Sequence, residues 1–295
     1  MTGYIILEQE KVYPLFSGHN TVCVAVAVIE LGMVEIADAV HFKLEAPGGI
    51  VDIEAKMTGK RVDSISMVGM KSFVEKQDLS TNRKEILDLM PLNPNDGTGI
   101  EKHPTQNGLT GSTRPNLTRG QDRSNPIERR KPESINFDIC FGGMFYVIVD
   151  ADRYHLELKP ENGRLLSQIG EMLKADAQEK FPVNHPDFDY PGPDILAFTS
   201  TKTGRHVNTV VMSNGSFDWA RPSSWNAMLD RSPCGSDRVF IYSSVYFFAN
   251  DIQFVTYHSI CHTSRKLEFE GLQQSWRIEF QKECFPRMKN LKIFQ

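Results

Sequence analysis

The sequence has few cysteines, no excess of basic residues and no long hydrophobic run. Its five cysteines are widely spaced, and none forms a Cys-x-x-Cys pair or a cluster of Cys and His with the spacing of a zinc site. Lys and Arg number 33 against 37 Asp and Glu, so a formal charge of −4 gives no electrostatic basis for binding nucleic acid. The composition argues against a disulfide framework, a metal site and a nucleic-acid partner.

The sequence also contains no apolar stretch long enough for a membrane-spanning helix. Such a helix needs roughly 18 apolar residues, and the longest apolar stretch, residues 22–31, is shorter and contains Glu30. Residues 1–9 lack the basic region, apolar core and small-residue cleavage site of a secretory signal. We therefore expect a soluble, cytoplasmic protein that does not contact a membrane.

Helix and strand patterns both occur, so the predicted fold class is mixed α and β. Residues 17–32 begin at Ser17, a favourable N-cap, and end at Gly32, so they predict a buried helix despite their many β-branched residues. Residues 161–177 carry apolar side chains at helical spacing with charged residues between them, which predicts an amphipathic helix. Alternating or continuous apolar residues predict strands in a meander over 40–74, in two strands within 135–150, and at 195–198 and 207–212.

Residues 91–133 differ sharply from their surroundings. They are rich in Pro, Gly, Asn, Thr and Arg and contain few large apolar side chains. Such a segment cannot bury enough apolar surface to offset the entropy lost on ordering. We expect a disordered insertion over residues 90–134.

Cys234 stands in the most informative hexapeptide, Asp230-Arg231-Ser232-Pro233-Cys234-Gly235. A cysteine between Pro and Gly at the start of an element can face free backbone N–H groups, which lower the thiol pKa and allow it to carry a proton. The alternative is that Cys234 is a small buried hydrophobic residue, as most free cysteines are.

This hexapeptide belongs to an ordered series of motifs that resembles the proline racemase family. The series comprises residues 8–32 with Ser17-Gly18-His19-Asn20, the turn Ala46-Pro47-Gly48-Gly49, residues 141–150, His185-Pro186, residues 210–215 with Asp218-Trp219, residues 229–235, and a weaker match over 258–271. The resemblance implies two pseudo-symmetric α/β lobes of the diaminopimelate epimerase-like kind. It also implies an acid/base residue from each lobe, on opposite faces of a proline-type substrate.

The family resemblance assigns roles to individual residues. Cys234 is the principal acid/base residue, and Ser17 stands at the other acid/base position. Gly18 and His19 on one side, with Gly235 and Ser236 on the other, are expected to bind the substrate carboxylate at two helix N-termini. Asp230 is expected to accept a hydrogen bond from the ring ammonium.

Ser17 departs from the pattern of proline racemase itself, which has cysteine at this position. A hydroxyl is a much weaker acid than a thiol and a poor base at neutral pH unless a neighbour activates it. Family members that act on hydroxyprolines also combine serine with cysteine, either in epimerisation at the α-carbon or in dehydration of the 3-hydroxy isomer. The alternative is that Ser17 is a plain helix N-cap, and the two roles are compatible.

Other departures concern the first lobe and the second motif. The opening strands of the family's first lobe have no counterpart, so we expect an incomplete first lobe. After Gly235 the sequence has Ser236-Asp237-Arg238 where the family has Thr-Gly-Thr, and an acidic side chain there would repel a carboxylate. The resulting domain prediction is a partial first lobe over 1–89, the insertion over 90–134, a second lobe over 135–271 and a divergent tail over 272–295.

Three functions remain open at this level. The first is a racemase or epimerase acting at the α-carbon of proline or hydroxyproline, with no cofactor. The second is a trans-3-hydroxy-L-proline dehydratase, and the third is an inactive relative with a binding role only. The expected partner is this small-molecule substrate, and both a monomer and a homodimer are compatible with the sequence.

Overall fold

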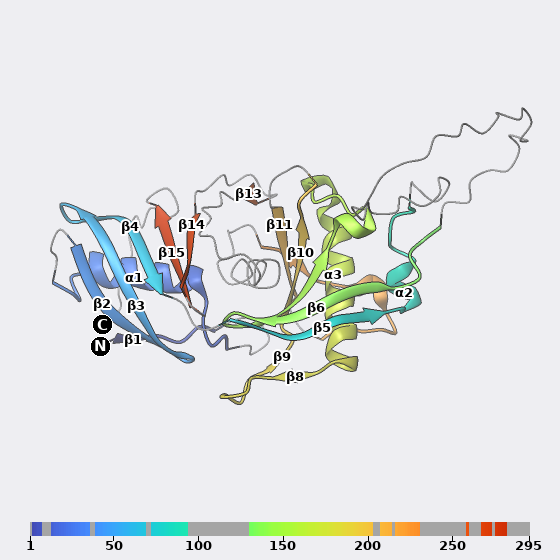
Figure 1. The fold of residues 1–295 in the computed structure, drawn as a ribbon, viewed down its shortest axis with the longest axis horizontal. Helices are drawn as coiled ribbons and strands as arrows, with labels where there is room; N and C mark the ends of the chain where they lie inside the picture. Colours follow the sequence, from blue (N-terminus) through green and yellow to red (C-terminus); the bar gives the residue numbers. More distant parts are fainter. Residues whose placement is uncertain are drawn as a thin grey trace, which may run out of the picture.

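The computed structural model of the protein describes residues 2–7, 13–35, 39–68, 72–93, 130–202, 207–213, 216–230, 258–259, 267–272 and 275–281. These residues form a mixed α and β structure with two large sheets side by side along the long axis, each with a long helix against it (Figure 1). Each sheet and its helix enclose a separate hydrophobic cluster. We call the unit with helix α1 the first lobe and the unit with helix α3 the second lobe.

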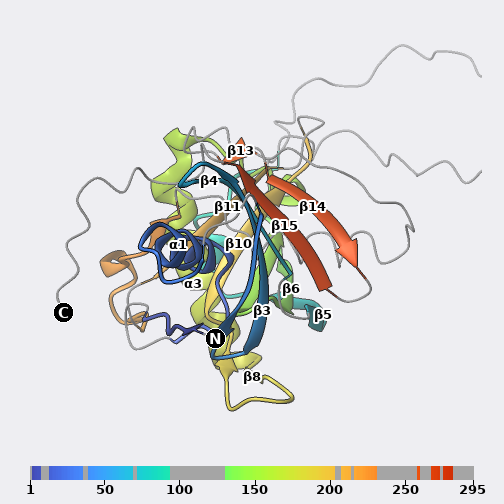
Figure 2. The same cartoon turned by 90° about the vertical axis from the view of Figure 1, so that its left-hand side faces the viewer.

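The sheet of the first lobe has six strands in the order β1-β2-β3-β4-β15-β14. Their bounds are β1 (Thr2–Gly3), β2 (Ala39–Ala46), β3 (Gly49–Thr58), β4 (Arg61–Val68), β14 (Leu267–Leu272) and β15 (Ser275–Gln281). Helix α1 (Gly18–Glu30) lies on one side of this sheet (Figure 2). Buried Ala25 and Ile29 of the helix belong to the same cluster as Ile53 of β3, so the β-branched helix is stabilised by packing on the sheet.

The sheet of the second lobe has the order β12-β11-β10-β7-β6-β5, and β13 pairs with β11. Its strands are β5 (Phe73–Thr81), β6 (Ile135–Phe141), β7 (Phe145–Asp150), β10 (Ile195–Ser200), β11 (Val207–Met212), β12 (Met228–Leu229) and β13 (His258–Ser259). The smaller elements are α2 (Lys84–Leu87), η2 (Asp152–Tyr154), η3 (Pro160–Asn162), η4 (Pro222–Ser224) and the pair β8 (Val183–Asn184) and β9 (Pro191–Gly192).

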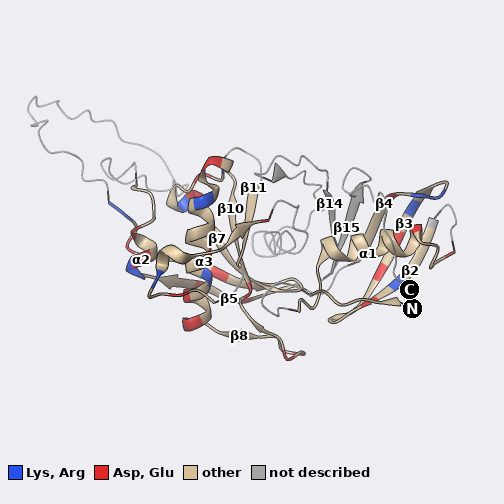
Figure 3. Ribbon diagram, turned by 180° about the vertical axis from the view of Figure 1, so that it is seen from behind, with Lys and Arg blue, Asp and Glu red and all other residues tan. Residues whose placement is uncertain are grey.

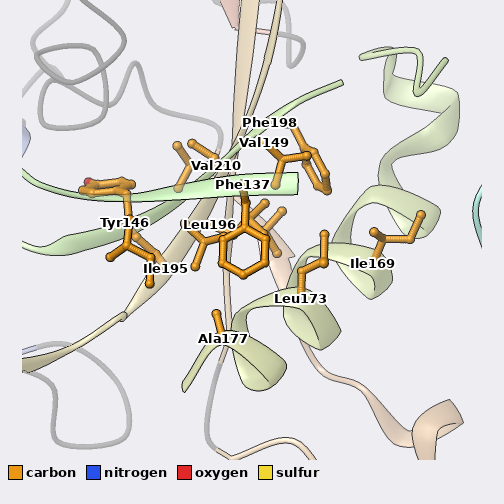
Figure 4. Close-up of a cluster of buried hydrophobic side chains, with 14 of the residues drawn as sticks. Phe137, Tyr146, Val149, Ile169, Leu173, Ala177, Ile195, Leu196, Phe198 and Val210 are labelled. Carbon is orange, nitrogen blue, oxygen red and sulfur yellow. The ribbon is translucent and has the colours of Figure 1, made fainter. Parts of the chain in front are cut away.

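Helix α3 (Gly163–Lys180) supplies the core of the second lobe. Figure 4 shows Ile169, Leu173 and Ala177 on the side of the helix that meets the strands. All three are fully buried, as are Leu196 and Phe198 of β10. The helix is therefore held mainly by apolar burial against β10 and β11.

The structure has helices and strands at the predicted positions, and two strands pair in a different sheet from the one that their place in the chain suggests. Strand β5 lies within residues 1–89 but pairs with β6 in the second lobe. Strand β14 crosses the predicted boundary at residue 271 and belongs with β15 to the first lobe. Hydrophobic alternation identifies a strand without identifying its partner, so the pattern alone did not assign these strands to a sheet. Most of the expected insertion, residues 94–129, lies outside the described residues.

No helix in the described ranges is long and apolar enough to cross a membrane. Figure 3 shows Lys and Arg as well as Asp and Glu on α3 and on the strands of the first lobe. Both signs of charge are thus present on each lobe.

The segment that leads into α1 is held by turns from both lobes. The N–H groups of Leu15 and Phe16 donate to the carbonyl oxygen of Gly143, at 3.1 and 3.3 Å, in the turn between β6 and β7. The carbonyl oxygen of Leu15 accepts from the N–H of Gly48, at 2.9 Å, in the turn between β2 and β3. We call these three hydrogen bonds the junction, because they fix the chain just before Ser17 relative to both sheets.

Gly143 is required at the junction for two reasons. Its φ of +103° lies in a region that other residues rarely adopt. A Cβ atom at this position would also lie 2.4 Å from the carbonyl oxygen of Phe16. Any side chain would therefore push the two lobes apart at this point.

Gly143→Ala is expected to destabilise the protein by about 3 kcal/mol, because backbone strain and a steric clash add together. Gly49→Ala is the matched control, since Gly49 has a φ of +130° and no atom within 4 Å of a built Cβ. Thermal denaturation should show a larger loss of Tm for Gly143→Ala than for Gly49→Ala. Equal losses would mean that the close approach at the junction contributes nothing.

Asp194 is a half-buried residue directly before β10. Its Oδ2 atom accepts from the N–H of Phe145 at 2.9 Å and from the hydroxyl of Tyr190 at 3.0 Å. Burial nevertheless raises the pKa of Asp194 to about 6 from 3.8. Between these two pH values the folded state holds a proton that the unfolded state has lost, so stability falls as the pH rises from about 4 to 6.

Asp194→Asn is expected to remove this fall, which amounts to about 2–3 kcal/mol. The amide oxygen of Asn can accept both hydrogen bonds, and the side chain does not ionise. Urea denaturation of wild type and variant at pH 4, 5, 6 and 7 should give a stability difference that shifts in favour of the variant across this range. Asp189→Asn, at an exposed position in the preceding loop, is the control, and parallel pH curves for Asp194→Asn and wild type would contradict the prediction.

Candidate active site

Ser17 is the N-cap of α1, as the sequence predicts. Its backbone is extended, with φ −140° and ψ 118°, and its Oγ atom accepts from the backbone N–H of Asn20 at 3.5 Å. The side-chain amide of Asn20 donates to the same oxygen at 3.1 Å. Two N–H donors thus converge on the Ser17 hydroxyl, which leaves the hydroxyl proton available to donate elsewhere.

The first turn of α1 also presents unpaired backbone donors. In the part of the chain that the structure describes, the N–H groups of Gly18 and His19 donate to no protein acceptor. The first helical turn contains no acidic residue, and His19 is exposed while Gly18 is buried. Free N–H groups and the helix dipole make this helix end favourable for an anion such as a carboxylate.

A buried pair of hydroxyls holds the backbone of Ser17. The Oγ1 atom of Thr21 donates to the carbonyl oxygen of Ser17 at 2.7 Å, and the hydroxyl of Tyr4 is hydrogen-bonded to Thr21 Oγ1. Thr21 is fully buried. Burial raises the pKa of Tyr4, so the phenol stays neutral and able to donate. Strand β1 is therefore tied to the start of α1 through two side chains.

Asp230 lies in the other lobe, directly after β12. Its N–H donates to the carbonyl oxygen of Val210 at 2.9 Å, which extends the pairing of β12 with β11. The structure thus brings Ser17, Gly18 and His19 together at one helix end and places Asp230 at the margin of the second sheet. Three further predicted site residues, Cys234, Gly235 and Ser236, lie outside the described residues.

Cys23 and Cys140, the cysteines that lie among the described residues, are not candidates for acid/base chemistry. Cys140 is fully buried in the second lobe, and burial raises the pKa of its thiol far above the ordinary value. Cys23 is half-buried on α1, and burial raises its thiol pKa as well. Both thiols therefore stay protonated at neutral pH.

A pocket of about 340 Å³, lined by both polar and apolar residues, opens on the first sheet. His41, Lys43, Asp52, Glu54 and Ser66 contribute to its lining. These positions alternate with the residues that pack on α1, so the pocket and the helix lie on opposite faces. The pocket is therefore separate from the predicted site.

Sequence reasoning missed the charged residues that α3 buries. Glu171, Lys174 and Asp176 are 2%, 7% and 0% exposed, although an amphipathic helix should place such residues in solvent. Glu171 is covered by residues 216–229, which we call the crossing segment and which lie on a second side of α3. Lys174 contacts Ser213 instead, and Asp176 contacts Arg83 and Lys180. The one sequence signal of close packing on this helix, Gly170, concerns the sheet instead, since a Cβ there would lie 2.6 Å from Val211 of β11.

Comparison with known proteins gives a consistent family match. The family model of proline racemase matches residues 1–90 and 121–239. The chain is 24% identical to the 4-hydroxyproline 2-epimerase of Allorhizobium ampelinum over 236 residues, covering 79% of this chain and 51% of that protein. It is also 24% identical to the 4-hydroxyproline 2-epimerase of Rhizobium etli, covering 79% of this chain and 52% of that protein. The chain spans about half the length of these curated relatives.

Solved structures show the same fold. A hydroxyproline epimerase from Agrobacterium vitis, with trans-4-hydroxy-L-proline bound, superposes with a TM-score of 0.68 at 21% identity over 95% of this chain and 67% of that one. A probable proline racemase from Agrobacterium radiobacter, with bound carbonate, gives a TM-score of 0.67 at 20% identity over 95% and 68%. Because the family model matches most of the sequence and the fold agrees, the chain belongs to the proline racemase family.

Proposed function

We propose that the protein is an acid/base enzyme that acts without a cofactor at the α-carbon of proline or a hydroxyproline, as a racemase or epimerase. The observation that carries this proposal is the geometry at the start of α1. There a hydroxyl, two unpaired backbone N–H groups and a helix dipole lie within one turn. Relatives described as 4-hydroxyproline 2-epimerases support a hydroxyproline as the substrate.

The two lobes provide the two faces of the proposed site. Each lobe has a sheet with a helix packed on it, which supports a pseudo-symmetric relationship between them. In this proposal Ser17 comes from the first lobe, and Asp230 and Cys234 come from the second. The N–H groups of Gly18 and His19, with Gly235 and Ser236, bind the carboxylate, and Asp230 accepts from the ring ammonium.

The reaction needs one base and one acid on opposite sides of the substrate. The Cys234 thiolate removes the α-proton and becomes a thiol, while the electron pair of the broken C–H bond spreads onto the substrate carboxylate. The Ser17 hydroxyl then donates its proton to the other face of the α-carbon, which inverts the centre. The donors around the carboxylate stabilise the charge that develops there.

Asn20 assists this role of Ser17. When the hydroxyl gives up its proton, the two N–H groups of Asn20 at 3.1 and 3.5 Å face the oxygen that becomes negative. Hydrogen bonds to the charged form favour that form. The second candidate function is a dehydratase. In that reaction Cys234 takes the α-proton and the ring hydroxyl departs as water, and the weakly acidic hydroxyl of Ser17 is compatible with this chemistry as well.

The purified protein is expected to exchange the α-proton of trans-4-hydroxy-L-proline with solvent. Samples in deuterium oxide with L-proline, trans-4-hydroxy-L-proline or trans-3-hydroxy-L-proline are followed by proton NMR of the α-position and the ring. Exchange without loss of the hydroxyl identifies an epimerase or racemase, and loss of the 3-hydroxyl identifies the dehydratase. A folded sample that does neither contradicts catalysis and favours an inactive relative.

Cys234→Ser should reduce either reaction by a factor of about 10³ or more, because the hydroxyl that replaces the thiol is a poor base. Cys140→Ser is the control for the loss of a thiol that has no acid/base role, provided that its fold is verified by circular dichroism. Turnover that survives in Cys234→Ser would remove Cys234 from the mechanism.

Ser17→Cys should raise the rate of α-proton exchange, because a thiol is a stronger acid and a better base than a hydroxyl. The substitution also weakens the cap of α1, at a cost of about 1 kcal/mol in stability. Cys23→Ser serves as the parallel variant, since it removes a thiol from the same helix without touching its N-terminus. A rate for Ser17→Cys at or below that of wild type, in a folded protein, would show that position 17 does not face the α-carbon.

A further inference from the structure

The crossing segment follows α3 along its length in the opposite direction. Near its start, the indole N–H of Trp219 donates to Glu179 Oε1 at 2.6 Å, close to the C-terminal end of the helix. At its end, Leu229 packs against Gly163, the first residue of the helix, where a Cβ would lie 3.3 Å from the Leu229 side chain. The chain then continues directly to Asp230.

Glu171 holds the crossing segment just before it joins the sheet. The backbone N–H groups of Asn226 and Ala227 both donate to its Oε2 atom, at 2.9 and 3.0 Å. Ala227 is buried and immediately precedes β12. One buried carboxylate oxygen therefore satisfies two successive backbone donors shortly before Asp230.

The charge of Glu171 is balanced from the same helix. Lys174, one turn further along α3, is 7% exposed, and its ammonium group donates to Ser213 Oγ at the end of β11. Burial lowers the pKa of Lys174, whereas the nearby carboxylates of Glu171 and Asp194 favour its charged form. Lys174 thus holds the strand that leaves the sheet, and Glu171 holds the segment that returns to it.

We propose that Glu171 is a positioning residue for the Asp230 half of the active site. By fixing Asn226 and Ala227, it sets where β12 pairs with β11 and hence where Asp230 stands. This inference rests on the proposed function, since it assumes that Asp230 receives the ring ammonium of the substrate. Glu171 does not touch the substrate in this account and acts through the backbone of residues 226–230.

Three variants separate this role from general stabilisation. Glu171→Ala removes both hydrogen bonds, whereas Glu171→Gln retains one oxygen that can accept both of them. Glu179→Ala is the matched control, because it removes a glutamate of the same helix that bonds the same crossing segment at its other end, through Trp219.

The first measurement is hydrogen exchange by mass spectrometry on the full chain, which needs no ligand. Peptides covering residues 226–230 should exchange about tenfold faster in Glu171→Ala than in wild type, since local opening no longer breaks two hydrogen bonds. Glu171→Gln should stay close to wild type, and Glu179→Ala should change exchange around Trp219 instead. Unchanged exchange over 226–230 in Glu171→Ala would overturn the inference, whatever the function of the protein.

The second measurement compares two ligands by titration calorimetry. Trans-4-hydroxy-L-proline has a ring ammonium, and tetrahydrofuran-2-carboxylate has a ring oxygen in its place and cannot donate to Asp230. Glu171→Ala should weaken binding of the first about tenfold and of the second less than about twofold, because only the first uses the hydrogen bond to Asp230. If the variant turns over substrate, KM should rise while kcat is unchanged.

The outcomes distinguish this inference from the proposed function. Equal weakening of both ligands, or of neither, in Glu171→Ala would overturn the positioning role while wild-type binding of hydroxyproline still supported the proposed function. Failure of wild type to bind any cyclic amino acid would overturn both. The selective loss in Glu171→Ala, with Glu171→Gln and Glu179→Ala near wild type, is the result that supports the inference.

Discussion

The junction at Leu15 and Phe16 is the constraint on which the rest of the site depends. Helix α1 has many β-branched residues and would be marginal in isolation, so its start must be fixed by tertiary contacts. One carbonyl oxygen of the second lobe, that of Gly143, accepts both N–H groups, and Gly48 of the first lobe donates to Leu15. The position of the first acid/base candidate is thereby determined by both sheets at once.

The second lobe is constrained by the charged side chains that α3 buries. A helix covered on two sides must pair the charges that it places inside, because an unpaired buried charge is costly. Asp176, fully buried, lies 3.3 Å from Arg83 and 3.0 Å from Lys180. Glu171 is satisfied by backbone donors instead. The hydrogen bonds that compensate for the burial of Glu171 on α3 also fix the path of the crossing segment.

Local patterns predicted most elements of this fold but not their assembly. The two caps of α1, Ser17 and Gly32, outweighed its β-branched content, and apolar spacing located α3. The sheet membership of β5 depends on pairing with β6, which lies far away in the sequence, and no periodicity encodes it. For the candidate site, sequence motifs predicted roles for Ser17 and Asp230, whereas nothing in the sequence pointed to Glu171, because its burial depends on the crossing segment.

The environment of Ser17 favours one direction of proton transfer. Its oxygen already accepts from Asn20, so the lone pairs are engaged while the hydroxyl proton remains free. A hydroxyl held in this way is arranged to give a proton and to be stabilised afterwards, rather than to remove one. In the proposed reaction the stronger base therefore comes from the other lobe. The two proposed half-sites are then unequal in chemistry even though each lobe has a similar sheet and helix, and this inequality follows from one residue at a helix cap.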